Sequence, residues 1–217
     1  MRAVAPGRLK ESAKQFAIRI RNLSPSRSLI VHHGDADGLC GAAILGTTLE
    51  KIGCQPRLVC LEKLFPEVLR EIHSGENDLV SYVDLGSPHV NRISEANPKK
   101  KPVLVIDHHD SEETEDTSIM NFNPELYGLS GESEASGSTM AYVISRQIEA
   151  SAQRFSAIAL IGSAELPGDL VGINLEVFKE AIKHDLAKLS KSGRGKSIQI
   201  RLGESWINRH KASSILT

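Results

Sequence analysis

The sequence predicts an α/β fold with a doubly wound, mostly parallel sheet that is flanked by helices. Four short apolar runs, bordered by turn-forming or charged residues, are typical of buried strands. Between these runs, apolar residues recur at the spacing of a helix. Strands that alternate with helices in this way form parallel sheets with helices on both faces.

The predicted elements alternate along most of the chain. The first part predicts a helix over 9–23, then strands over 28–33, 57–61, 78–86 and 101–109, with helices over 39–53, 65–75 and 89–97 between them. Residues 110–138 lack periodicity, so we expect a long ordered loop, and loops of this length are usually functional. Helices are expected again over 138–153, 154–164 and 174–190.

The composition is that of a globular protein with little net charge. With a formal net charge of -1, attraction to a polyanion must come from a local patch or from bound cations. No run approaches the roughly 18 apolar residues of a membrane span, and the first residues lack a signal-peptide core. We therefore expect a cytoplasmic location and no membrane association. The three cysteines have no CxxC spacing and are predicted to be buried free thiols.

Acidic and imidazole side chains gather at the ends of three predicted strands. The first strand ends in HHGDADG, the third in VDLG and the fourth in IDHH. Ligands of an open parallel sheet bind beyond the carboxyl ends of its strands. One rim would therefore hold His33, Asp35, Asp37, Asp84, Asp107, His108 and His109. No Lys or Arg lies in these segments to pair the carboxylates, and unpaired buried carboxylates are strongly unfavourable.

Two divalent cations would relieve this repulsion, because carboxylates can bridge metals about 3.5 to 4 Å apart. Mixed Asp and His ligands favour Mn²⁺, with Mg²⁺ as the alternative, and the lack of thiolates disfavours zinc. Taken alone, the HxDxDG segment is equally typical of a turn whose Asp side chains bond backbone amides. The convergence of three strand ends favours the metal site. The histidines outside these segments, His73, His89, His184 and His210, are predicted to be surface residues.

Four motifs resemble those of a known family. HHGDADGLCGAAI, YVDLGS, VLVIDHHD and NFNPELYGLSGESEASGSTMAYVISRQI are similar to the motifs of DHH phosphoesterases, and most closely to archaeal RecJ-like proteins. The resemblance covers about residues 8–185, nearly all of the N-terminal DHH domain. It implies phosphodiester hydrolysis that depends on two Mn²⁺ or Mg²⁺ ions, in which water attacks phosphorus in line.

The resemblance also implies a role for each motif residue. It assigns His33 and Asp35 to one cation, Asp37 and His108 to the other, and Asp84 to the bridge between them. His109 would contact the substrate phosphate, so that Asp84, His108 and His109 form the catalytic set, and Asp107 would orient the motif. For Ser136, Gly137 and Ser138, which precede a predicted helix, phosphate binding and simple N-capping are equally supported.

The fourth family motif departs from the expected pattern. A ligand Asp normally follows a Gly-containing apolar helix, whereas this chain continues as ALIGSAELPGDL. Either Glu165 or Asp169 could complete the second metal shell, or neither, which would impair catalysis.

The resemblance assigns residues 1–190 to a DHH catalytic domain and leaves 191–217 as a connector or tail, without the second domain usual in the family. The leading interpretation is a RecJ-like exonuclease that acts on single-stranded DNA or RNA in replication and repair. One alternative is a non-catalytic scaffold that binds a protein of a replication complex. Another is a phosphodiesterase of short oligonucleotides or cyclic dinucleotides.

Overall fold

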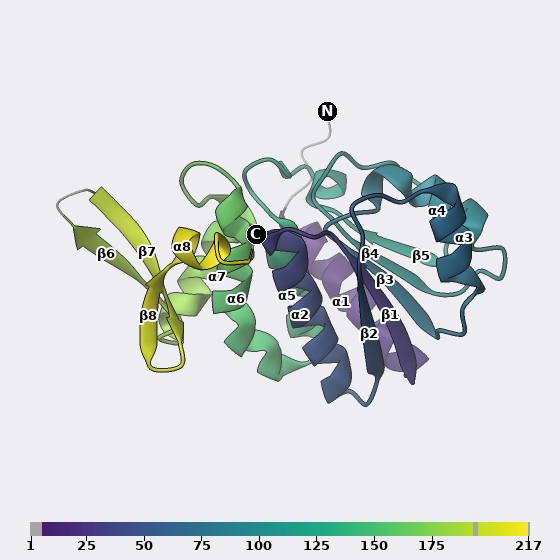
Figure 1. Ribbon diagram of the computed structural model, residues 1–217, viewed down its shortest axis with the longest axis horizontal. Coiled ribbons are helices and arrows are strands. Elements are labelled where there is room, and N and C mark those ends of the chain that lie inside the picture. The colour runs from purple at the N-terminus through teal and green to yellow at the C-terminus, as the bar shows by residue number, and fades with distance from the viewer. Residues whose placement is uncertain (1–5, 193–194, 217) are drawn as a thin grey trace.

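The computed structural model describes residues 6–192 and 195–216, which fold around a five-stranded parallel sheet (Figure 1). Its strands are β1 (Arg27–His32), β2 (Gln55–Cys60), β3 (Leu79–Val83), β4 (Val103–Ile106) and β5 (Ile119–Phe122). Their spatial order is β2-β1-β3-β4-β5, and each neighbouring pair is parallel. The predicted α/β class and parallel sheet are confirmed.

Helices cover both faces of this sheet (Figure 1). The helices of the described chain are α1 (Pro6–Leu23), α2 (Ala36–Lys51), α3 (Pro66–Ser74), α4 (Val90–Ala96), α5 (Gly137–Ile148), α6 (Ser156–Gly162), α7 (Gly172–Lys183) and α8 (Arg209–Ser213), of which the first five lie against this sheet. Short 3₁₀ turns are η1 (Ser87–His89), η2 (Pro124–Tyr127), η3 (Ala150–Phe155) and η4 (Ser163–Glu165). Helices α1, α2 and α5 pack on one face, and α3 and α4 lie on the other (Figure 1).

The central strands are apolar because both of their faces are buried. Along β4, Leu104 and Ile106 enter the larger core beneath α1, α2 and α5, whereas Val103 and Val105 enter the smaller core beneath α3 and α4. Side chains alternate between the faces of a strand, so a strand covered on both sides has no polar position to alternate with. This explains the continuous apolar runs in the sequence.

The segment 110–138, expected to be a loop, contains strand β5 and turn η2. Strand β5 has only four residues, and Asn121 interrupts its apolar character. Its pairing with β4, from Val103 opposite Ile119 to Ile106 opposite Phe122, depends on the finished sheet more than on local sequence.

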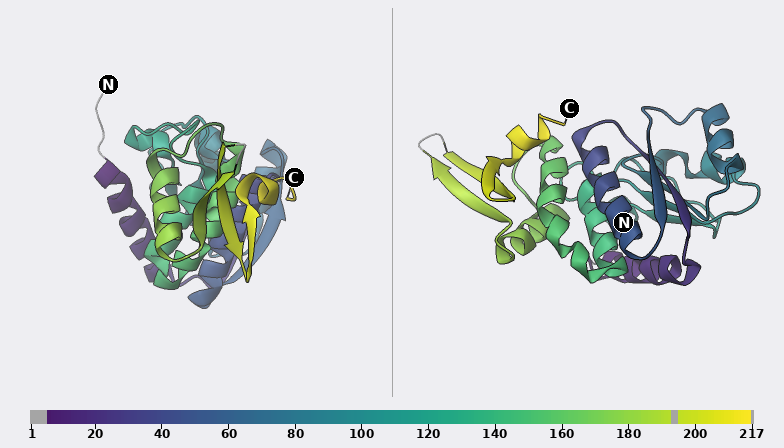
Figure 2. Two further views of the ribbon diagram at one scale, coloured as in Figure 1. Left: turned by 90° about the vertical axis from the view of Figure 1, so that its left-hand side faces the viewer. Right: turned by 60° about the horizontal axis from the view of Figure 1, so that its bottom comes forward.

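A second, antiparallel sheet follows α7 and lies beyond α6 and α7, away from the main sheet (Figure 2). Its strands are β6 (Ala187–Ser192), β7 (Gly195–Leu202) and β8 (Ser205–Asn208). The structure differs here from the expected connector over 191–217, and the predicted boundary at residue 190 falls inside β6. Residues 1–5, 193–194 and 217 of the two predicted regions lie outside the described residues. The division into domains stays a prediction.

Two smaller predictions are wrong. Cys40 and Cys54 are buried as expected, but Cys60 is exposed at the end of β2. His73, expected on the surface, is 4 % exposed, and its Nε2 lies 2.9 Å from the Tyr82 hydroxyl. Within the described ranges, the helices all fall short of the length or the apolar character required to cross a membrane.

Candidate metal centre

The carboxyl ends of β1, β3 and β4 meet at one edge of the sheet. Strand β1 lies between β2 and β3, so the chain leaves it toward one side of the sheet and later continues on the other. Such a switch point is where open α/β sheets bind ligands, because the loops diverge there and leave a crevice. The loops after these three strands carry the predicted acidic and imidazole residues.

The loop after β1 supplies one side of the cluster. Asp35 is the N-cap of α2 and accepts a hydrogen bond from the Gly38 amide at 2.9 Å. Its other oxygen lies 2.5 Å from Nδ1 of His33. Burial opposes ionisation of Asp35, but these two hydrogen-bond partners hold its pKa below the ordinary value. Asp35 is therefore an anion fixed in position by the start of a helix.

Asp84 lies at the centre of the cluster, directly after β3. Its backbone is left-handed, with φ 62°, a conformation that Asp tolerates better than most residues. The side chain is 2 % exposed, and within the described residues its Oδ1 has no hydrogen-bond partner. Burial raises the pKa of Asp84 well above the ordinary value, and the charges of Asp37 and Asp35 raise it further.

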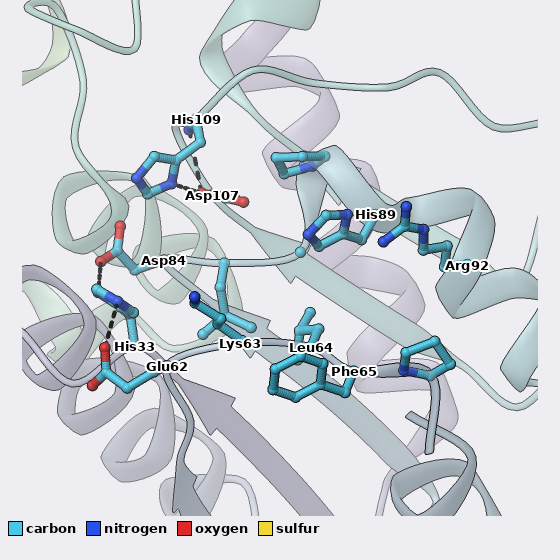
Figure 3. Close-up of a pocket in the computed structure, with 14 residues that line it drawn as sticks. His33, Glu62, Lys63, Leu64, Phe65, Asp84, His89, Arg92, Asp107 and His109 are labelled. Carbon is cyan, nitrogen blue, oxygen red and sulfur yellow. Dashed lines mark hydrogen bonds and ion pairs between the residues drawn. The ribbon is translucent and has the colours of Figure 1, made fainter. Parts of the chain in front are cut away.

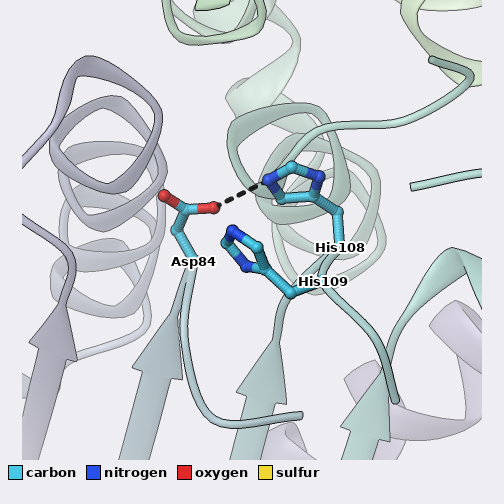
Figure 4. Close-up of side chains that lie close together, drawn as sticks. All are labelled: Asp84, His108 and His109. Carbon is cyan, nitrogen blue, oxygen red and sulfur yellow. Dashed lines mark ion pairs between the residues drawn. The ribbon is translucent and has the colours of Figure 1, made fainter. Parts of the chain in front are cut away.

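The DHH segment after β4 directs two imidazoles toward Asp84 (Figure 4). Nδ1 of His108 lies 2.7 Å from the Gly131 carbonyl, which can only accept, so this nitrogen carries the proton. Its other ring nitrogen, Nε2, faces Oδ1 of Asp84 at 3.2 Å, without the geometry of a hydrogen bond. Gly131 is required at this contact, because a Cβ there would overlap the His108 carbonyl oxygen.

Asp107 is fully buried and holds the segment in place. It accepts hydrogen bonds from the amides of Ser87, His108 and His109. Its Oδ1 also lies 2.7 Å from Nδ1 of His109. Burial raises the pKa of Asp107, but these hydrogen bonds and the contact with His109 outweigh burial and keep the pKa below its ordinary value. The same contact with Asp107 raises the pKa of His109, whose side chain is half exposed beside the cluster.

Asp37 connects the cluster to the N-terminus of α5. It accepts hydrogen bonds from the amides of Gly137 at 2.6 Å and Ser138 at 2.9 Å, and from the Ser136 hydroxyl at 2.9 Å. Ser136 is the N-cap of α5 in a capping box with Thr139. Ser136 therefore caps α5, as one of the two interpretations expects. Contact of Ser136, Gly137 and Ser138 with a substrate phosphate stays a prediction, and in this structure their donors serve Asp37.

Two groups of potential ligands converge, and both contain Asp84. One is Asp84, His108 and His109, the other is His33, Asp35 and Asp84, and in each the donor atoms lie within 4.8 Å of one another. An unpartnered, buried carboxylate oxygen between oxygen and nitrogen donors suits a divalent cation that prefers Asp and His ligands. The residues thus fit a metal site, and Asp84 is common to both halves.

Asp37 belongs to neither group, although its Oδ2 lies 3.7 Å from Nε2 of His108. Of the two candidates for the fourth motif, Glu165 is the one that contacts the segment after β1. It accepts a hydrogen bond from the Ala36 amide at 2.9 Å, and burial together with the charge of Asp35 raises its pKa. Asp169 is exposed on the loop between η4 and α7. Among the described residues, neither is part of a potential ligand group.

A pocket of about 380 Å³ opens beside the cluster, and sequence reasoning missed most of its wall (Figure 3). His33, Asp84 and His109 line it at one end, whereas Phe65, His89 and Arg92 belong to the segments around α3 and α4. His89, expected to be an unremarkable surface residue, is half-buried in this wall. No motif marks these positions, and the sequence signal for them is Phe65 within the charged segment EKLFPE.

A parallel sheet with carboxylates and imidazoles converging at its switch point defines an α/β protein with a candidate metal centre. The chain belongs to the DHH family: residues 27–163 match the model of the DHH family, N-terminal domain. This confirms the resemblance found in the motifs.

Solved structures share the fold. RecJ in complex with Mn²⁺ from Thermus thermophilus superposes with a TM-score of 0.63 and 22 % identity, covering 83 % of this chain and 28 % of that one. CDC45 from Entamoeba histolytica gives a TM-score of 0.59 and 18 % identity, covering 84 % of this chain and 39 % of that one. Likeness at these identities establishes the fold alone.

A curated relative is an uncharacterised protein of Methanocaldococcus jannaschii, 26 % identical over 172 residues. The match covers 74 % of this chain and 38 % of the relative. The chain thus spans less than half the length of these relatives.

Proposed function

We propose that the protein is a metal-dependent phosphodiesterase that hydrolyses nucleic acid from a single-stranded end, as a RecJ-like exonuclease does. The observation that carries this proposal is Asp84, which belongs to both potential ligand groups and whose buried Oδ1 has no hydrogen-bond partner among the described residues. The Mn²⁺ and Mg²⁺ complexes of RecJ, which share the fold, support divalent cations as the partners.

His33, Asp35, Asp84 and His108 would hold the cations, with Asp84 between them and Asp37 or Glu165 completing the second site. Bound divalent cations supply positive charge at the phosphoryl oxygens and make water more acidic. The protein fixes the geometry in advance: the Gly131 carbonyl sets the tautomer of His108, so that its Nε2 lone pair faces the cluster.

His109 would bind the substrate phosphate. Asp107 holds the proton on its Nδ1, and the raised pKa favours the imidazolium form, which attracts an anion. Its half-exposed ring can reach a phosphate in the pocket while Asp107 stays fully buried. Asp107 thereby positions His109 and leaves the contact with substrate to that residue.

The test is the release of nucleotides from end-labelled single-stranded DNA and RNA with Mn²⁺ or Mg²⁺, compared between the wild type and Asp84→Asn. Asn also tolerates a left-handed backbone, so the variant keeps the fold while losing the charge. We expect a loss of activity of roughly 100-fold or more. Mn²⁺ affinity in calorimetry should fall by at least about 10-fold.

Asp78→Asn is the matched control, because Asp78 precedes β3 at the opposite edge of the sheet, where it accepts hydrogen bonds from Ser26 and Arg27. This variant should bind Mn²⁺ as the wild type does. Near-normal turnover by Asp84→Asn would remove the central assignment.

A non-catalytic scaffold in a replication complex is the second candidate. It is favoured by the position of Glu165 and Asp169, since within the described part of the chain neither joins a potential ligand group. The likeness to CDC45 in fold is compatible with it. Folded wild-type protein that releases no nucleotide at any metal concentration would select this candidate.

A further inference from the structure

A groove between α3 and α4 begins at the candidate metal centre and continues along the protein surface. The pocket beside the cluster shares Pro66 and Arg92 with a second cavity of about 220 Å³. That cavity shares Arg70, Glu95 and Ala96 with a third one of about 370 Å³. The three cavities therefore lie next to one another, and we call this row of cavities the α3–α4 groove.

The groove is cationic beyond the metal centre, although the chain as a whole has a net charge of -1. Lys63, Arg70, Arg92 and Lys99 line it, against the carboxylates of Glu62 and Glu95 outside the cluster. Glu62 is engaged with His33 at 3.3 Å, and Arg70 with Glu67 at 3.0 Å. In the described ranges, no acidic side chain lies within 4.0 Å of the Lys63 or Arg92 cation.

Phe65 is an exposed aromatic at the entrance to this groove. It is 57 % exposed, whereas its neighbour Leu64 is 7 % exposed and packs into the smaller core. Figure 3 shows the Phe65 ring facing the pocket, with His89 and Arg92 across from it and the acidic cluster at the far side. The chain has five Phe residues, and this one is kept out of the core beside two cations.

We propose that the α3–α4 groove binds the single strand that runs away from the reacting phosphate, with Phe65 stacking on a base and Lys63 and Arg92 contacting the backbone. An aromatic face beside cations is how proteins hold single-stranded nucleic acid without reading its sequence. A protein partner on this surface would not explain why Lys63 and Arg92 lack acidic neighbours, or why the groove begins beside the metal centre. The inference rests on the proposed function, whose substrate it places.

The test is equilibrium binding of labelled phosphorothioate oligothymidylate, which resists hydrolysis, followed by fluorescence anisotropy with Mn²⁺ present. A matching 2′-O-methyl oligouridylate distinguishes RNA from DNA. Phe65→Ala should weaken binding by roughly fivefold or more, and Phe65→Trp should retain it. Lys63→Met and Arg92→Met should each lower the slope of log affinity against log salt by about 0.7, the loss of one backbone contact.

Two variants outside the groove are matched controls: Ile18→Ala, at an apolar side chain that is 49 % exposed on α1, and Lys179→Met, at an exposed lysine on α7. Both should bind as the wild type does. Binding that is absent, or unchanged in all groove variants, overturns the proposal. A weaker affinity of Lys63→Met with an unchanged salt slope would also contradict the backbone contact.

Hydrolysis of bis(p-nitrophenyl) phosphate, a small diester that does not extend along the groove, separates this inference from the proposed function. If binding depends on the groove but neither bis(p-nitrophenyl) phosphate nor end-labelled single-stranded DNA is hydrolysed, the groove is kept and the phosphodiesterase is rejected. If the groove variants hydrolyse both of these substrates at wild-type rates, the phosphodiesterase is kept and the groove is rejected.

Discussion

Buried polar residues differ in how the structure satisfies them, and His73 is one that lies away from the candidate centre. Its Nε2 lies 2.9 Å from the Tyr82 hydroxyl, while within the described residues its Nδ1 has no partner. Burial lowers the pKa of His73 from 6.5 to about 4, and the charge of Lys101 adds to the effect. The folded protein therefore keeps this imidazole neutral where the unfolded chain would protonate it.

This difference makes stability depend on pH. Because the unfolded chain binds more protons between the two pKa values, the contribution of His73 is complete above about pH 6.5 and is lost as the pH falls toward 4. The maximum loss is about 3 kcal/mol. In urea unfolding, the free energy of unfolding of His73→Gln should decrease less than that of the wild type across this pH window. His184→Gln, at an exposed histidine, should show the same decrease as the wild type. Equal decreases in all three proteins would contradict the assignment.

Single residues also show where sequence reasoning stops. The rim residues were predictable because strand ends of a parallel sheet converge, whatever the details of packing. The burial of His73 and the exposure of Cys60 depend instead on which side of α3 and β2 meets the rest of the protein. Local sequence does not determine that choice. The same holds for Phe65, whose ring faces the pocket only because Leu64 takes the core position.

Packing of α5 against α6 determines the position of Asp37. A Cβ on Gly162 would overlap the Ser138 hydroxyl oxygen and lie 2.8 Å from Oδ1 of Asp37. Gly162→Ala should therefore push α6 away from the start of α5 and displace that carboxylate. We expect a loss of about 1–3 kcal/mol in the free energy of unfolding, together with weaker Mn²⁺ binding.

Gly7→Ala is the control for this prediction, because no atom lies within 4 Å of a Cβ at Gly7 in α1. That variant should be neutral or more stable by up to about 1 kcal/mol. If chemical denaturation gives the two alanine variants the same stability, the close contact at Gly162 is not what restricts it to glycine.

Elements differ in how well the sequence predicts them. The strands β1, β3 and β4 were predictable because they are covered on both faces and consist mainly of buried apolar residues. The expected helix over 174–190 is too long, since α7 ends at Lys183 and Asp185 has a left-handed φ of 55°. Apolar residues alternate with Lys and Ser in β6 and with Gln and Arg in β7, a pattern that is difficult to recognise in a basic segment.

The second sheet is attached to the rest of the molecule through its apolar face. Ile200 of β7 is fully buried in the larger core, and Ala187 of β6 and Ala212 of α8 are buried in the same core. We therefore propose that this sheet and the main domain unfold together. A tail that folds independently of the main sheet would not place Ile200 in the larger core.

Ile200→Ala should lower the stability of the whole described fold by about 2–5 kcal/mol, through lost burial and the cavity left behind. Leu189→Ala, in the same sheet but 48 % exposed, should change stability by less than about 1 kcal/mol. Circular dichroism and Trp206 fluorescence should give coincident transitions for both variants. An early fluorescence transition, with the main one unchanged in Ile200→Ala, would show that the segment folds by itself.

The uneven burial of the three cysteines has a practical consequence for labelling. Burial raises the pKa of Cys40 to about 12, and burial also raises the pKa of Cys54, so neither presents a reactive thiolate. Cys60 is exposed at the end of β2, where a Cβ on Gly34 would lie 3.2 Å from its sulfur. A thiol-directed dye can thus be placed at one position of the unaltered protein. It would report from the end of β2, beside Gly34 of the HGDADG segment.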